Sequence, residues 1–230
     1  MTSQVDLQWP LTLIRECNSS ATLFSRGLDT VRTMRHDYTD SVVAMSLLAL
    51  GAEKMLKLTI GMSERDQGRD WPTKKVMREN VGHRVLKADQ NARALLDAHA
   101  GTVPGLLDGM KTQVAADPVL PVVLNALDAF GDAGRFHYLD VLTGATPDDE
   151  SPQTLWGELT TAMTVGDPAL LADIKSTENY ERGRQRLNKE ITDSLTRWWE
   201  LYIAAWRTGA IGDEAKRYAH ELALEARDAR

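Results

Sequence analysis

Residues 42–52 read VVAMSLLALGA, an almost unbroken series of apolar and small side chains. A helix that is apolar around its whole circumference is buried on most sides. Thr39 or Asp40 can accept the free backbone N–H groups at the start of such a helix. Glu53 and the two lysines that follow it within four residues make the segment amphipathic where it leaves the core. We therefore expect a central helix that continues to about Ile60.

Long amphipathic runs lie on both sides of this segment. Residues 11–35 place apolar side chains at spacings of three and four, and residues 174–207 do the same without any proline. Leucine and alanine far outnumber valine and isoleucine, and aromatic residues make up only 6% of the chain. This composition favours helices over strands. The sequence predicts an all-α fold, a helical bundle of seven to nine helices.

Glycine and proline mark the expected ends of these helices. We expect a long loop at residues 61–73. Helix starts are expected just before prolines, at Thr102 or Val103, Asp117, Ser151 and Asp167. Residues 144–152 are the best candidate for a linker. The organisation is therefore either a bundle over residues 1–145 followed by a C-terminal helical extension over residues 150–230, or one continuous domain.

Several classes of protein and of chemistry find no support in the sequence. There is no run of about 20 apolar residues and no signal-peptide pattern, so we expect a cytoplasmic protein without a membrane partner. The chain has no glycine-rich phosphate loop, and its five histidines show no metal-ligand spacing, so we expect no metal and no cofactor. The single Cys17 falls on the apolar face of the first helix, and we expect it to be a buried small hydrophobe.

Basic residues gather in one segment, although the whole chain has a net charge of −6. Residues 65–87 hold seven basic and three acidic residues, whereas residues 101–173 hold two basic and eleven acidic ones. A polyanion such as RNA would be attracted to the first segment and repelled by the second. The residues that we expect to contact RNA are Lys74, Lys75, Arg84 and Lys87. An ordinary solvated helix surface explains the same charge pattern.

The basic segment also contains Arg78 and His83, which are separated by four residues where a loop meets a helix. Imidazole can transfer protons near neutral pH, and a guanidinium can hold a phosphate through two hydrogen bonds. The pair therefore suits cleavage of a phosphodiester through the ribose 2′-OH, with His83 as acid and base and Arg78 on the phosphate. The alternative is that Gly82 and His83 form a helix entrance with no chemical role.

The order of these elements resembles that of the HEPN family. The resemblance lies in Ala52-Glu53-Lys54-Met55-Leu56-Lys57 at the end of an apolar helix, then a loop, then Gly82-His83 before a helix, and it covers about residues 40–100. It implies an HEPN-like N-terminal bundle. Many members are metal-independent RNases that act as homodimers in toxin–antitoxin or phage-defence systems, with an Arg followed by four to six residues and a His. Arg78 and His83 fit that spacing. Other members are non-catalytic interaction or scaffold proteins.

Two further clusters are candidates for function. Arg135, His137 and Tyr138 lie within four residues and could line a polar pocket, and the alternative is a buried Arg135 paired with a neighbouring acid. Trp198 and Trp199 lie in the long C-terminal helix, where adjacent side chains point roughly 100° apart. The helical spacing indicates core or subunit packing, and since one apolar stripe cannot bury both side chains, we expect this helix to contact a second subunit or another domain. A protein partner is expected if the chain is a non-catalytic interaction protein.

Overall fold

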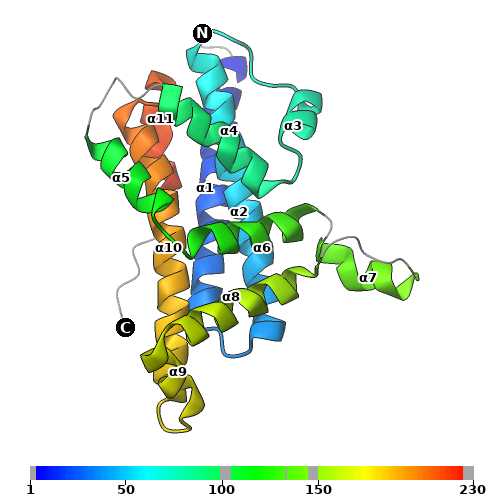
Figure 1. Ribbon diagram of the computed structural model, residues 1–230. Helices are drawn as coiled ribbons and strands as arrows, with labels where there is room; N and C mark the ends of the chain where they lie inside the picture. The colour runs from blue at the N-terminus through cyan, green and yellow to red at the C-terminus, as the bar shows by residue number, and fades with distance from the viewer. Residues whose placement is uncertain (1–3, 99–104, 133, 145–149, 225–230) are drawn as a thin grey trace.

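The computed structural model describes residues 4–98, 105–132, 134–144 and 150–224, and within them all regular structure is helical (Figure 1). The all-α prediction is therefore confirmed. The eleven α-helices of these residues are α1 (Gln4–Arg32), α2 (Asp37–Asp66), α3 (Lys74–Asn80), α4 (Val85–Ala98), α5 (Leu106–Ala115), α6 (Leu120–Asp132), α7 (His137–Leu142), α8 (Pro152–Gly166), α9 (Pro168–Lys175), α10 (Tyr180–Thr208) and α11 (Asp213–Tyr218). Two short 3-10 helices are η1 (Gly134–Phe136) and η2 (Ala219–Leu222).

The expected number of seven to nine helices is too low. The two helices that the sequence did not reveal are α3 and α7, which are seven and six residues long. Neither helix buries any of its residues. Because hydrophobic periodicity arises from burial of one face, a short exposed helix leaves no such signal in the sequence.

The helices α1 and α2 pack against each other in the core, and their backbones lie close together. A Cβ atom at Gly51 would lie 2.8 Å from the backbone nitrogen of Phe24, so glycine permits the close approach. The run at residues 42–52 is largely buried, although the side chains of Val43 and Leu50 are exposed. The prediction of a central helix in this segment is confirmed by its burial between neighbouring helices.

The boundaries of α1 and α2 differ from those expected. α1 begins before residue 11 and includes Pro10. α2 begins at Asp37, and the carboxylate of Asp40 accepts backbone N–H groups of the preceding turn, which lowers the pKa of Asp40. The helix also continues through the first six residues of the predicted loop 61–73. Gly61 lies inside the helix rather than at its end, and it leaves room for the ring of Trp71, since a Cβ atom there would lie 2.3 Å from that ring.

Three of the predicted helix starts are confirmed. In each, the side chain before a proline accepts a backbone N–H group of the first turn, which satisfies a donor that has no partner within the helix. The three capping residues are Asp117, Ser151 and Asp167. The predicted start at Thr102 or Val103 lies outside the described residues, as does most of the predicted linker at residues 144–152.

The long helix α10 runs beside α1 through the centre of the molecule (Figure 1). Trp198 and Trp199 are both fully buried within this one chain. The ring of Phe24 stacks on Trp199 at 4.3 Å between centroids, and the Trp199 indole donates to the carbonyl oxygen of Leu222 at 2.9 Å. Both tryptophans therefore lie in the core, because α10 is covered from several sides rather than along one stripe. The contact of Trp199 with Phe24 joins the predicted C-terminal extension to the predicted N-terminal bundle.

A buried carboxylate joins α4 to α10. Asp89 accepts hydrogen bonds from the Trp198 indole at 2.7 Å and from the Tyr202 hydroxyl at 2.6 Å, and it pairs with Arg93 at 2.7 Å. Burial, together with the negative charge of Asp89, raises the pKa of Tyr202 well above its usual range. The hydroxyl therefore stays protonated and keeps donating to Asp89.

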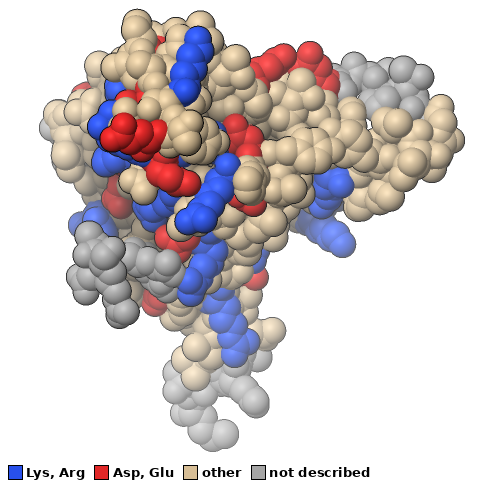
Figure 2. All heavy atoms as spheres, turned by 90° about the horizontal axis from the view of Figure 1, so that it is seen from below, with Lys and Arg blue, Asp and Glu red and all other residues tan. Residues whose placement is uncertain are grey.

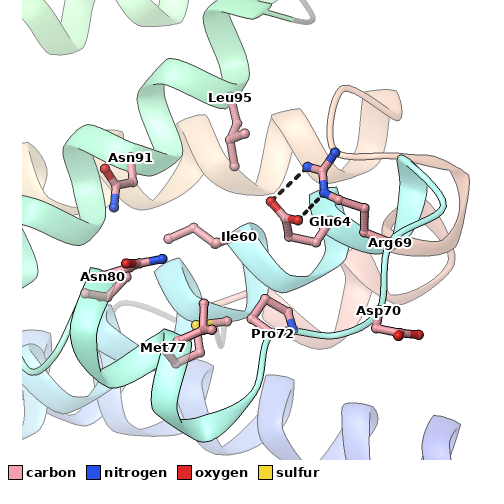
Figure 3. A pocket seen from close by; sticks show the side chains of 11 residues that line it. Ile60, Glu64, Arg69, Asp70, Pro72, Met77, Asn80, Asn91 and Leu95 are labelled. Carbon is pink, nitrogen blue, oxygen red and sulfur yellow. Dashed lines mark hydrogen bonds and ion pairs between the residues drawn. The ribbon is translucent and has the colours of Figure 1, made fainter.

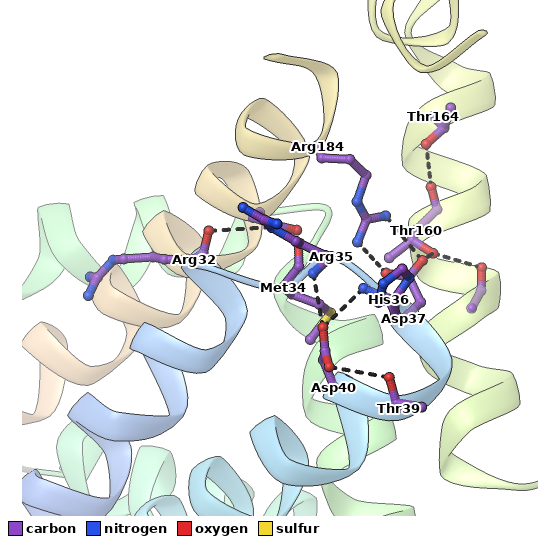
Figure 4. A network of polar contacts seen from close by, with 12 residues as sticks. Arg32, Met34, Arg35, His36, Asp37, Thr39, Asp40, Thr160, Thr164 and Arg184 are labelled. Carbon is purple, nitrogen blue, oxygen red and sulfur yellow. Dashed lines mark hydrogen bonds and ion pairs between the residues drawn. The ribbon is translucent and has the colours of Figure 1, made fainter. Parts of the chain in front are cut away.

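A second polar network fixes the turn between α1 and α2 (Figure 4). Arg184 on α10 pairs with Asp37 at the start of α2, and the hydroxyl of Thr160 on α8 donates to the same carboxylate at 3.1 Å. The amide of Asn188 donates to the carbonyl oxygen of Met34 at 2.9 Å. Side chains from α2, α8 and α10 thus meet at one end of the bundle, and the turn is held between them.

One hydrophobic core receives buried side chains from both before residue 145 and after residue 150. Among the helices that the structure describes, no single one is long and apolar enough to cross a membrane. The pair α5 and α6, bent by 77°, meets that test only when the two are taken together.

The Asp89 network predicts a large and specific stability loss. Asp89→Ala removes the acceptor for two buried donors, and each unsatisfied donor costs about 1–3 kcal/mol. We expect urea unfolding to show a loss of about 3 kcal/mol or more. Asp108→Ala is the matched control, since Asp108 is exposed and lies 3.8 Å from Lys111, and we expect a change within about 0.5 kcal/mol. A loss below about 1 kcal/mol for Asp89→Ala would contradict the assigned role.

The burial of Cys17 predicts an unreactive thiol. Cys17 is fully buried, as expected, and burial, with smaller contributions from the charges of Glu221 and Glu16, raises its pKa to about 12. Because the thiolate is the reactive form, almost none is present at pH 8. Labelling with iodoacetamide at pH 8 should be very slow in the native protein and rapid in urea. Fast labelling of folded protein would show that the first helix opens readily.

Candidate functional site

The segment that carries the predicted site is α3 and the turn that leads to α4. The hydroxyl of Thr73 accepts the backbone N–H of Val76 and caps α3. After α3 the chain passes through Gly82, whose φ of +62° is in the left-handed region that favours glycine. The first turn of α4 is capped from outside, because the carboxylate of Asp128 on α6 accepts the backbone N–H of Leu86 at 2.8 Å. The turn therefore has a fixed shape.

His83 lies in this turn, and its side chain pairs with that of Glu53 on α2. Its Nδ1 atom is 3.1 Å from Oε1 of Glu53, and the same oxygen accepts a hydrogen bond from Lys57 at 2.6 Å. The His83 side chain is 56% exposed, whereas that of Glu53 is 13% exposed. In the described part of the chain Nε2 of His83 has no partner. A carboxylate on one ring nitrogen thus orients an imidazole whose other nitrogen is free.

The turn also packs against α6. This packing supports the alternative that Gly82 and His83 form a helix entrance. A Cβ atom at Gly131 would lie 2.5 Å from the carbonyl oxygen of His83. The backbone of the turn therefore approaches α6 at a position where glycine leaves room for it. A structural role for the Gly82-His83 backbone and a chemical role for the His83 ring are compatible, because the first uses the main chain and the second uses the side chain.

The basic segment is less positive in the structure than its composition indicates. Arg84 pairs with Asp128 at 2.7 Å and reaches Asp132 at 3.4 Å, which gives it a structural role at the start of α4. Lys87 donates to the carbonyl oxygen of Glu79 at 3.1 Å. Two further arginines of the segment, Arg65 and Arg69, pair with Glu214 and Glu64.

The cations left for a ligand lie on α3. Lys74, Lys75 and Arg78 are all exposed, and in the described residues only Lys75 has an ionic neighbour, Glu79 at 4.0 Å. Elsewhere charges of both signs alternate, as on the face seen from below the view of Figure 1 (Figure 2). The structure thus brings Arg78, His83 and two of the four predicted RNA-contacting lysines and arginines to one short exposed helix and the turn beside it.

A pocket of about 410 Å³ opens between α2, α3 and α4 (Figure 3). Its apolar walls come from all three helices and the turn, and they comprise Ile60, Met77, Val81 and Leu95. Figure 3 shows the carboxamides of Asn80 and Asn91 at one end and the ion pair of Arg69 with Glu64 at the other. Glu53 and Ile60 are seven residues apart, so the His83 pair and the pocket lie on one face of α2, roughly 10 Å apart along its axis.

The second predicted cluster lies on the surface, at η1 and the start of α7. Arg135 is exposed, and its guanidinium lies 5.5 Å from the ring centroid of Phe136, so the expectation of a buried Arg paired with an acid is wrong. The His137 and Tyr138 rings meet edge to face at 5.1 Å. The Tyr138 hydroxyl lies 3.3 Å from the hydroxyl oxygen of Ser151. Tyr138 is also hydrogen-bonded to Tyr38, and this bond raises the pKa of Tyr38. These contacts attach α7 to its neighbours.

Sequence reasoning missed three residues of the candidate site. Glu53 belongs to the motif that resembles the HEPN family, but nothing in the sequence indicates its contact with His83, which spans thirty residues. Asn80 and Asn91 gave no signal, because an exposed asparagine in a helix has no distinctive pattern. In the described residues no group of three or more His, Cys, Asp or Glu side chains is placed to hold a metal ion.

Comparison with known proteins gives no relative from which a role can be transferred. No family model matches the chain, and neither a curated protein nor a solved structure is significantly similar to it.

Proposed function

We propose that this protein engages RNA or a nucleotide through α3 and the turn that leads to α4, and that it cleaves RNA without a metal ion. The observation that carries the proposal is the pair of His83 and Glu53, which presents a half-exposed imidazole beside a helix with unpaired cations. The HEPN resemblance supports it, because Glu53 comes from the apolar helix of that motif and His83 from its Gly-His element. A toxin or phage-defence role follows from the resemblance alone.

The proposed reaction is transfer of a phosphodiester to the ribose 2′-OH. The neutral His83 ring takes the 2′-OH proton while that oxygen attacks phosphorus, and the bond to the 5′-oxygen breaks. The products are a 2′,3′-cyclic phosphate and a 5′-hydroxyl, and the proton returns to the leaving oxygen. Glu53 stabilises the imidazolium that forms, and Arg78 holds the phosphate oxygens through its fork of donors.

The decisive experiment is RNA cleavage in EDTA. Wild-type protein should cut mixed RNA and leave DNA intact, because DNA lacks the 2′-OH. His83→Ala should lower the rate by about 10²- to 10⁴-fold, and Arg78→Ala should weaken substrate binding. His220→Ala is the matched control, since His220 is an exposed histidine on η2, far along the chain from the site.

Two results would reject the catalytic role. The first is cleavage that persists in folded His83→Ala protein, with folding checked by circular dichroism. The second is the absence of any cleavage by the wild type. RNA binding is measured separately at two salt concentrations, since affinity held by Lys74 and Lys75 should fall steeply as salt increases.

The second candidate function is a non-catalytic interaction protein, and the exposed apolar side chains of η1 and α7 favour it. Leu142 is 82% exposed, Leu139 59% and Phe136 53%. In Figure 1, α7 projects from the body of the bundle. Apolar side chains concentrated on so short a segment are typical of a contact surface.

We propose that a second copy of this chain covers α7. The segment of η1 and α7 carries one exposed basic and one exposed acidic side chain, Arg135 and Asp140, so two copies related by a two-fold axis can pair Arg135 of each with Asp140 of the other. Both residues are exposed, and neither has an ion-pair partner among the described residues. This proposal keeps the expected homodimer and moves its interface from α10 to α7.

Light scattering tests the α7 interface. Wild-type protein should show a concentration-dependent dimer, and Leu139→Arg or Leu142→Arg should give a monomer, because a charge would be buried without a partner. Val165→Arg is the matched control, since Val165 is an exposed apolar residue on α8. A wild type that stays monomeric at every accessible concentration would disprove the interface, as would dimers that tolerate both α7 substitutions.

A further inference from the structure

We propose that the pocket between α2, α3 and α4 binds one base of the RNA or nucleotide, an inference that rests on the proposed function. Asn80 and Asn91 pair with the hydrogen-bonding edge of the base, and the apolar walls contact its ring (Figure 3). The pocket is separate from the His83 turn, so it would determine which nucleotide is held rather than how the phosphodiester is cut.

The dimensions and walls of the pocket suit a flat heterocycle. Its volume of about 410 Å³ falls within the range of about 300–1,000 Å³ that is typical of small-molecule sites. Ile60, Val81 and Leu95 offer aliphatic surface, and Met77 adds a flexible thioether. Sulfur packs favourably against aromatic rings, and a side chain with three rotatable bonds adapts to bases of different shape.

The two carboxamides provide the means of recognition. Each offers a carbonyl acceptor and an amide donor side by side, the arrangement that pairs with the adjacent donor and acceptor on a base edge. Neither the Asn80 nor the Asn91 side chain has a hydrogen-bond partner among the residues that the structure describes. Their position at one end of an apolar pocket leaves these groups available to a ligand (Figure 3).

The charges of the pocket favour a neutral ring over a phosphate. Arg69 is the one cation among the lining residues, and it is already bound by both oxygens of Glu64, whose pKa the pairing lowers. Asp70 adds a second carboxylate to the lining. A phosphate inside would therefore meet net negative charge, whereas an uncharged base would not.

The two faces of α3 also differ in charge, with an uncharged face toward the pocket and a cationic face away from it. Val76, Met77 and Asn80 line the pocket, whereas the helical period of 3.6 residues places Lys74, Lys75 and Arg78 on the other side of α3. The helix itself therefore separates a base in the pocket from the cations of α3. A phosphate held by these cations would belong to another nucleotide of the same RNA strand, and the pocket would hold its base without their help.

Titration with the four uncharged ribonucleosides tests the base pocket, with ribose alone as the probe that lacks a base. Ligand binding is followed by NMR of the full chain. We expect at least one nucleoside to bind saturably and to shift the side-chain amide signals of Asn80 and Asn91, which line the pocket. Asn80→Ala and Asn91→Ala should each weaken binding roughly 5- to 150-fold.

Gln90→Ala is the matched control, because Gln90 is an exposed carboxamide beside Asn91 on α4 that does not line the pocket. It should bind the nucleoside as the wild type does. The proposal is overturned if no nucleoside binds, if ribose binds equally well, or if both Asn variants bind like Gln90→Ala. Nucleoside binding should be insensitive to salt and to His83→Ala, so failure of the base pocket is distinguishable from failure of RNA cleavage.

Discussion

The carboxylate of Asp89 fixes one side of α4 against α10, while the helix packs on α2 and α6. By accepting from Trp198 and Tyr202 the carboxylate turns one side of α4 toward α10, and the buried neighbours Ala92 and Leu96 follow on that side. Asn91 is two positions further along the helix and therefore points roughly 200° away, toward α3. One side of α4 thus makes a polar contact in the core, and the other side supplies Asn91 to the polar end of the pocket.

Features of the fold that depend on local chemistry could be predicted from the sequence. Asp117 and Asp167 cap helices as their prolines indicate, and Cys17 is buried as its spacing on the apolar face indicates. Features that depend on the number of neighbouring helices could not. Trp198 and Trp199 point in different directions and are both buried, because α10 lies among several helices rather than on the surface of a bundle.

The candidate site was predictable only in part, because its contacts join residues that are far apart in the sequence. The sequence indicated that His83 follows a loop, but its contact with Glu53 exists only because α2 passes beneath that turn. Arg84 looked like another cation for RNA, yet its nearest partner is an acid on α6, forty-four residues away. Counting charges along a segment overestimates its positive potential wherever distant carboxylates fold onto it.

The late position of α10 in the chain has a consequence for synthesis. α1 and α2 leave the ribosome well before α10, yet the helix that covers Phe24 begins at Tyr180. At about 5–20 residues per second, roughly 10 seconds of translation separate the end of α2 from the start of α10. During that interval the first two helices carry an uncovered apolar face, and the nascent chain is then most open to aggregation and to proteases.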